Sequence, residues 1–246
     1  FLIDNPTNVL FSKNTLEVQM SHRFGELNTD KNNLAGFYGA SNIRIGLTYG
    51  VHDRLTVGFG TTKNKNYQDL NWKVAILRQT RSNKMPVSVS YYGNFAIDAR
   101  SKNQGLFPHV EDRYSYFNQL IIARRFNPNL SLQVAPSISH YNTVPITTRN
   151  DMVAISFGGR YKISPQTSVL VDYSQPLTKM RLDNPNPGIS FGVEFGTSAH
   201  TFSIFATNYF GILPQENYMF NRKATGLEGN SGQYLIGFNI TRNYNF

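Results

Sequence analysis

Large hydrophobic residues alternate with small or polar ones along most of this chain. In the stretch 188–196, for example, a large hydrophobic residue occupies every second position, with serine, glycine or glutamate in between. Side chains of a β-strand point alternately to opposite faces, so this period predicts strands with one apolar face. A helical period is never sustained over a long window. The predicted strands are residues 15–24, 43–49, 55–60, 70–76, 87–97, 113–124, 130–139, 152–161, 167–174, 188–196, 201–208 and 233–246.

Long and short joins alternate between these strands along the chain. Long joins fall at 25–42, 62–69, 98–112, 140–151, 175–187 and 209–232, and shorter ones at 50–53, 78–86, 127–129, 163–166 and 197–199. An outer-membrane barrel has short periplasmic turns, long extracellular loops and an even strand number. A soluble β-sandwich, the alternative for any such periodicity, does not need this alternation. We therefore predict an all-β fold, a closed antiparallel transmembrane barrel of about twelve strands.

The composition agrees with a membrane barrel. Only 16% of residues are charged, 13% are aromatic, and the mean hydropathy of −0.36 is too low for a helical membrane protein. Tyrosine and phenylalanine favour strands and collect at membrane interfaces. The absence of cysteine excludes disulfides and thiolate metal sites. Because the chain starts at Phe1, we expect a cleaved targeting segment, a periplasmic segment at 1–14 and a barrel at 15–246.

The end of the chain resembles the assembly signal of outer-membrane proteins, in which aromatic residues occupy the final and antepenultimate positions. Here these are Phe246 and Tyr244. The segments HRFG at 22–25 and NIRIGLTYG at 42–50 resemble an uncharacterised family of Gram-negative outer-membrane β-barrel proteins. The resemblance implies a Gram-negative outer membrane as the location, recognition by the barrel-assembly machinery during insertion, and contact with outer-membrane lipids and lipopolysaccharide.

Charged residues on the polar faces of the predicted strands are candidates for the barrel lumen. A barrel of this size has a narrow lumen, in which charges of both signs tend to pair. Two interpretations stay open at this point, a structural polar network and a pore that selects its solutes. The lumen candidates are Glu17, Arg23, Arg44, Lys73, Arg160, Asp172 and Glu194.

The net charge of +9 is unevenly distributed along the chain. Charges in the predicted long loops cancel, so the excess falls at periplasmic turns and strand ends, where anionic phospholipid headgroups or an acidic partner would be met. Nucleic-acid binding would require a continuous basic face with exposed aromatics, and we do not expect it. The basic residues in question are Arg78, Arg81, Lys84, Arg124, Arg125, Lys162 and Arg242.

We find no pattern that predicts an enzyme, a cofactor or a metal site. A histidine and a serine two residues apart would share one strand face, as in an outer-membrane phospholipase. In this chain, Ser21 and His22 are adjacent, as are Ser139 and His140, so each pair points to opposite faces. Metal and phosphate motifs are also missing from the sequence. A lipid-modifying enzyme therefore ranks below the other functions considered.

The join at 209–232 is the most apolar of the long ones, since it carries Ile212, Leu213, Tyr218 and Phe220. Exposed apolar side chains in a loop usually have a partner. They would plug the lumen, dock on another outer-membrane protein, enter the lipid boundary or pack on neighbouring loops. The leading functional hypothesis is a narrow passive channel for small polar solutes. The alternative is a non-conducting scaffold or accessory subunit of a larger outer-membrane complex.

Overall fold

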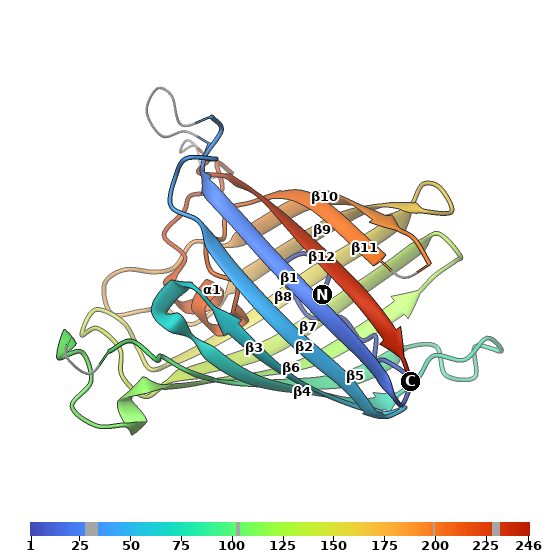
Figure 1. Ribbon diagram of the computed structural model, residues 1–246, viewed down its shortest axis with the longest axis horizontal. Helices are drawn as coiled ribbons and strands as arrows, with labels where there is room; N and C mark the ends of the chain where they lie inside the picture. Colours follow the sequence, from blue (N-terminus) through green and yellow to red (C-terminus); the bar gives the residue numbers. More distant parts are fainter. Residues whose placement is uncertain (28–33, 102–103, 199, 228–231) are drawn as a thin grey trace.

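The computed structural model describes residues 1–27, 34–101, 104–198, 200–227 and 232–246. Its strands form one closed antiparallel barrel in which each strand pairs with its neighbours in sequence and β1 pairs with β12 (Figure 1). The predicted fold class and strand number are confirmed. The strands are β1 (Thr15–Glu26), β2 (Asn42–His52), β3 (Leu55–Thr62), β4 (Gln68–Leu77), β5 (Ser88–Ile97), β6 (Tyr114–Arg125), β7 (Leu130–Tyr141), β8 (Asp151–Lys162), β9 (Thr167–Pro176), β10 (Gly188–Gly196), β11 (His200–Thr207) and β12 (Leu235–Asn245).

Most long connections lie at one end of the barrel and most short ones at the other, although 78–87 is longer than 63–67. One end, called the turn end below, carries the start of β1, the end of β12 and the connections 53–54, 78–87, 126–129, 163–166 and 197–199. The other, called the loop end, carries 27–41, 63–67, 98–113, 142–150, 177–187 and 208–234. Short 3-10 helices, η1 (Asn64–Asn66) and η3 (Glu111–Arg113), and one α-helix, α1 (Pro214–Phe220), lie in the loop-end connections.

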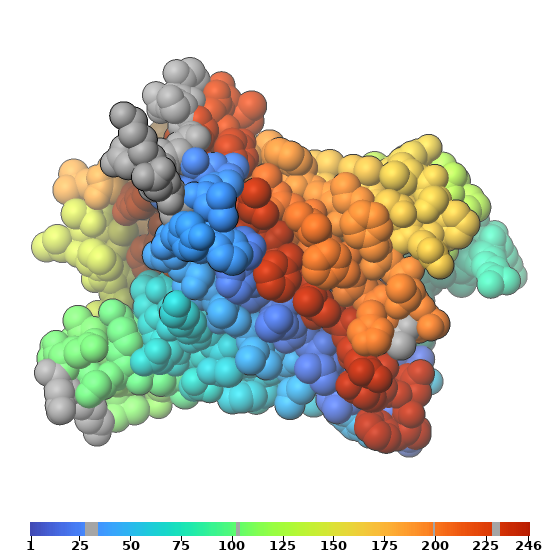
Figure 2. Space-filling view, turned by 45° about the horizontal axis from the view of Figure 1, so that its top comes forward, coloured from blue at the N-terminus to red at the C-terminus, as the bar shows by residue number. Residues whose placement is uncertain are grey.

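The strand alternation sorts side chains between the two faces of the wall. Leu47, Phe59 and Val171 are exposed on the outer face, whereas Thr56 and Ser190 are buried on the inner face. The first strand, β1, and the last strand, β12, lie side by side on the surface where the barrel closes; they are blue and red in Figure 2. No helix among the described residues is long and apolar enough to cross a membrane.

Two irregular stretches of sequence are regular strands in the structure. In β6, Ile121 interrupts the alternation because it points inward, where it is fully buried in the largest apolar cluster of the lumen. A proline inside a strand often marks a bulge, but β7 has none at Pro136. The β6–β7 register is the same on both sides of Pro136, and the proline ring is exposed on the outer face. Its missing N–H only interrupts the β6–β7 ladder locally.

The first residues of the chain lie inside the barrel. The sequence predicts residues 1–14 to be a periplasmic segment, yet Leu2, Ile3, Asp4 and Asn5 are buried among lumen side chains. The physical reason is local: two apolar residues followed by two hydrogen-bonding ones match an inner wall that offers both apolar and charged partners. Residues 1–11 are called the N-terminal segment below.

Candidate functional site: the occupied lumen

Two separate parts of the chain fill the lumen. The N-terminal segment contacts the inner faces of β1, β9, β10 and β11. The second part, residues 209–221, is called the loop segment and contains α1, which packs against β6, β7, β8 and β9. The hydroxyl of Tyr218 in α1 donates a hydrogen bond to the side-chain oxygen of Asn5. The two segments therefore meet inside the barrel.

Asp172 on β9 anchors the N-terminal segment by its backbone. Its Oδ2 atom accepts hydrogen bonds from the backbone N–H groups of Ile3, Asp4 and Asn5, at 3.3, 3.0 and 2.9 Å. Successive N–H groups that point to one centre form a small anion-binding concavity. Asn5 also donates its side-chain amide to Oδ1 of the same carboxylate. One buried carboxylate thus fixes the direction in which three residues run.

Asp4 fixes the same segment through its side chain. Its Oδ1 atom lies 3.0 Å from Nη2 of Arg23, and its Oδ2 atom accepts hydrogen bonds from Ser190 and Thr207. Arg23 is itself 1% exposed, and its guanidinium lies 4.3 Å from the ring centre of Phe205. Burying this charge alone would be strongly unfavourable, so Asp4 neutralises a wall that otherwise carries an unpaired cation.

The loop segment enters the lumen as a short helix. α1 starts at Pro214, where a missing N–H is tolerated because the first turn leaves it unused. Its side chains combine apolar packing with polar anchors: Met219 packs in the largest lumen cluster, and Gln215 donates to Asn94 Oδ1 at 2.7 Å. Ile212, Leu213 and Tyr218 are buried, whereas Phe220 is half-buried at the edge of that cluster.

Glu216 links α1 to η1 and makes docking of the helix dependent on pH. Lys65 Nζ lies 3.1 Å from Glu216 Oε1. Burial nevertheless dominates and raises the pKa of the Glu216 carboxyl above its ordinary value of 4.5, with Lys65 acting in the opposite direction. The docked helix therefore binds this proton more tightly than an undocked one. Protonation of Glu216 therefore stabilises the docked helix. This contribution is complete below pH 4.5 and is lost as the pH rises through the raised pKa of Glu216.

We expect acidification towards pH 4.5 to protect α1 further, and Glu216→Gln to remove this dependence. The measurement is maleimide labelling of the variant Met219→Cys, which is specific because the natural chain contains no cysteine. Labelling at position 219 should slow as the pH falls, after correction for thiol ionisation with an exposed control, Ile146→Cys. An identical corrected pH profile with and without Glu216→Gln would contradict the prediction.

All the predicted lumen residues lie on the inner face, but in different environments. Arg23 and Asp172 hold the N-terminal segment, as described. Arg44 makes two parallel hydrogen bonds to Asp69, from Nε at 2.8 Å and from Nη2 at 2.7 Å. Arg160 pairs with Glu194 at 2.9 Å. Sequence reasoning missed Asp4 and Asp69, the two acids that complete the most buried pairs.

Glu17 and Lys73 line a cavity of about 270 Å³ that the segments leave in the lumen. Its wall also includes Arg160 and Glu194, together with Asn and Thr side chains of β2, β3, β4, β11 and β12. The Lys73 ammonium donates to the backbone oxygen of Val9 at 2.8 Å. This space is lined by polar and apolar groups in about equal measure and carries charges of both signs.

The predicted C-terminal signal lies at the turn end. Tyr244 faces outward below the guanidinium of Arg242, at 4.8 Å, and Phe246 is 80% exposed. Their role in assembly stays a prediction. The adjacent serine–histidine pairs are separated by the wall, since Ser21 is buried inside while His22 stacks on Phe238 outside. Among the described residues, no three histidine, cysteine or acidic side chains are placed to share a metal ion.

The chain matches a known family of membrane barrels. A family model described as "Membrane bound beta barrel domain (DUF5777)" matches residues 1–244. The chain belongs to this family. The match confirms the resemblance to a family of membrane barrels and shows that this barrel is membrane-bound. No curated protein matches the chain in sequence.

Solved structures with the same fold are porins and channels. This family member is similar to the NanC porin, with a TM-score of 0.60 and 9% identity over 92% of this chain and 98% of that one. It is also similar to the COG4313 outer membrane channel from Pseudomonas putida F1, with a TM-score of 0.56 and 11% identity over 96% and 97%. A third is the KdgM porin, with a TM-score of 0.53 and 6% identity over 93% and 98%. At these identities, the likeness shows a common fold.

Proposed function

We propose that the protein is a gated passive channel for small polar solutes in the outer membrane of a Gram-negative bacterium. The described conformation is its closed state, with the turn end in the periplasm and the loop end outside. The observation that carries the proposal is a lumen that keeps a charged cavity and is occupied by two chain segments rather than by wall side chains alone. Segments of this kind are displaceable, whereas strands of a closed barrel are not.

The N-terminal segment is held mainly by polar contacts, which supports a gate. Asp172 and Asp4 make hydrogen bonds and an ion pair that water would replace if the segment left. Its apolar anchor is small: Leu2 and Ile3 cluster with Leu170 and Phe205, and the ring of Phe1 lies edge-on to Tyr92. The net free energy that holds such a segment is modest, because each hydrogen bond contributes about 0.5–1.5 kcal/mol once exchange with water is counted.

The solute class follows from the lumen charges. The three most deeply placed arginines of the inner wall lie beside carboxylates: Arg23 with Asp4, Arg44 with Asp69, and Arg160 with Glu194. A ladder of free cations suited to polyanions is not formed by these residues. One solved structure of the KdgM porin is a complex with disordered oligogalacturonate, an acidic oligomer. For the present barrel we instead propose neutral or dipolar solutes, passed without catalysis.

Replacing the Asp172 anchor should open the channel in part. In Asp172→Ala, three backbone N–H groups lose their acceptor, so the N-terminal segment should leave the wall between β9 and β1. We expect more frequent conducting steps in planar bilayers and faster maleimide labelling of Leu2→Cys in the same background. Asp183→Ala, in the exposed 177–187 loop, is the matched control. Faster labelling without conductance would refute the channel.

A non-conducting scaffold or accessory subunit is the second candidate. The observation in its favour is that two segments occupy the lumen together and contact each other, which is more than a simple pore requires. A scaffold predicts that Asp172→Ala gives no conductance, whether or not labelling of Leu2→Cys becomes faster. It also predicts that another outer-membrane protein co-purifies in mild detergent and is lost when exposed loop residues, rather than lumen residues, are replaced.

A further inference from the structure

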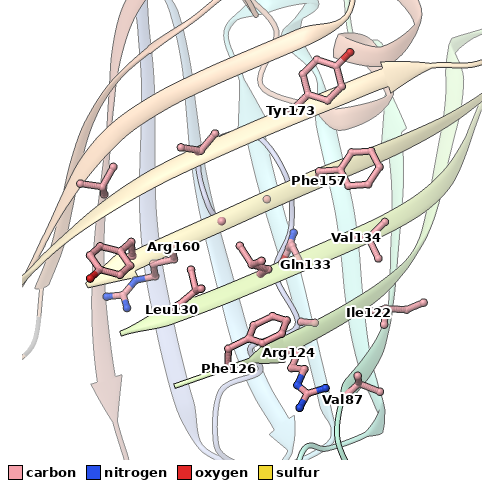
Figure 3. A pocket seen from close by; sticks show the side chains of 17 residues that line it. Val87, Ile122, Arg124, Phe126, Leu130, Gln133, Val134, Phe157, Arg160 and Tyr173 are labelled. Atoms are coloured by element: carbon pink, nitrogen blue, oxygen red, sulfur yellow. The ribbon is translucent and has the colours of Figure 1, made fainter. Parts of the chain in front are cut away.

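A deep apolar groove crosses the outer face of the barrel over β6, β7, β8 and β9 near the turn end (Figure 3). The groove is open to the outside, has a volume of about 680 Å³ and is lined almost entirely by carbon atoms. The outward side chains that form it include Leu132, Phe157, Tyr161 and Val171, all of which are exposed. A barrel wall is normally covered evenly by such side chains, so a hollow of this size has a specific cause.

The hollow exists because Gly159 occupies an outward position of β8. Its neighbours across the ladders are Leu132 on β7 and Val171 on β9. Phe157 and Tyr161, two residues to either side on the same strand, rise as walls along the glycine. A Cβ at position 159 would touch only Leu132, at 3.2 Å, so the glycine leaves space rather than avoiding a clash.

Arg124 stands at the turn-end mouth of this groove. It is the penultimate residue of β6, pairs across the ladder with Leu132, and carries its guanidinium 5.1 Å from the ring centre of Phe126. Its Nε atom is buried and has no hydrogen-bond partner among the described residues. Figure 3 shows Arg124 and Phe126 at one end of the lining, with Phe157 and Tyr173 at the other. A cation held by an aromatic ring at an apolar groove is complementary to an amphipathic anion.

The residues paired across the ladders under the groove, from Arg124 on β6 to Val171 on β9, lie progressively further from the turn end. Arg124 is near the end of β6, whereas Val171, three strands further along the same row, lies in the middle of β9. A ligand with its anionic group at Arg124 would therefore place its tail deeper in the hydrocarbon. This direction matches a lipid of the periplasmic leaflet, if the turn end is periplasmic as proposed above.

We propose that the groove is a binding site for one anionic phospholipid. A single acyl chain lies over Gly159 between Phe157 and Tyr161, and the phosphate accepts hydrogen bonds from the Arg124 guanidinium. The membrane supplies this ligand at high concentration, and a planar guanidinium suits a phosphate oxygen pair. The site rests on the orientation of the barrel but is independent of whether its lumen conducts.

The test is native mass spectrometry of the whole protein in mild detergent, titrated separately with dioleoyl phosphatidylglycerol and dioleoyl phosphatidylethanolamine. We expect one tightly retained phosphatidylglycerol. Arg124→Gln should weaken its binding about tenfold, as for one lost charge-assisted contact, and should abolish the preference over phosphatidylethanolamine. Gly159→Leu should fill the groove and weaken both lipids. This split separates headgroup recognition from acyl-chain recognition.

Matched variants lie elsewhere on the same outer face. Arg242→Gln removes an outward turn-end arginine that also covers an aromatic ring, and Ala206→Leu enlarges a small residue of β11. Both should bind lipid like the wild type, and heat-modifiable migration on gels checks that every variant folds. Equal binding by Arg124→Gln and Arg242→Gln would overturn the site. Displacement of the retained lipid by inorganic phosphate alone would also overturn the site. The same holds if Gly159→Leu loses a co-purifying protein and keeps its lipid.

Discussion

Removing both lumen segments should turn a closed barrel into one that conducts in regular steps. The change is deletion of residues 1–11 combined with replacement of residues 210–221 by a short Gly-Ser linker. The two segments contact different but overlapping sets of strands. The first bonds to β1, β4, β5, β7, β9, β10, β11 and β12, and the second packs its helix against β6, β7, β8 and β9. Each single removal therefore leaves part of the lumen filled, and the double variant should give the largest step. Planar-bilayer recording measures the step size for all three variants and the wild type.

The barrel itself should survive this change, because its closure depends on the ladders between neighbouring strands. Slower gel migration after boiling, as in the wild type, is the control for folding. A weakly selective pore is expected, since the exposed inner wall would carry charges of both signs. A double variant that folds, inserts and does not conduct would contradict the channel and leave the scaffold as the better hypothesis.

Asp69→Ala should lower the free energy of unfolding by about 3–5 kcal/mol, the usual cost of removing one partner from a buried ion pair. Arg44 is 7% exposed and lies across Gly46 and Gly60, where any larger side chain would clash with its guanidinium. It therefore has little freedom to turn towards water once the carboxylate is gone. Thermal or urea unfolding in detergent, read by the loss of fast gel migration, gives the change.

The double variant Arg44→Met with Asp69→Ala distinguishes this cause from lost packing. It removes the unpaired charge, so much of the stability should return. Asp151→Ala is a matched control, because its partner His140 is largely accessible to solvent. This pair should contribute less than about 1 kcal/mol. Equal destabilisation by Asp69→Ala and Asp151→Ala would show that the lumen ion pair is not buried in the way the structure describes.

The sequence predicted the wall of the barrel well because the wall obeys a local rule. Whether Arg44 or Asp172 faces inward depends only on its parity along a strand, which an alternating pattern reveals. Ile121 obeys this parity but departs from the hydrophobic alternation, because it is an apolar residue on the inner face. Its signal, three consecutive large apolar residues at 120–122, indicated an irregularity but gave no information about the apolar helix that packs inside.

The contents of the lumen were beyond such reasoning. Asp4 meets Arg23 and Ser190 because three distant parts of the chain converge, and no period connects them. Residues 2–5 carry one weak signal, an apolar pair next to an aspartate and an asparagine, in a stretch too short to classify. The loop segment was easier to predict from the sequence. The apolar character of 210–214 is unusual for a solvated loop, and a plug of the lumen is one of the explanations that it suggests.

The contact between Tyr218 and Asn5 has a thermodynamic consequence for communication across the membrane. Each segment is docked partly through the other, so whatever releases one lowers the stability of the other. Such coupling is reciprocal: a molecule that draws the N-terminal segment out from one side weakens α1 on the other side by the same free energy with which undocking of α1 would assist that molecule. In the orientation proposed above, events on either face of the membrane would be sensed at the opposite one.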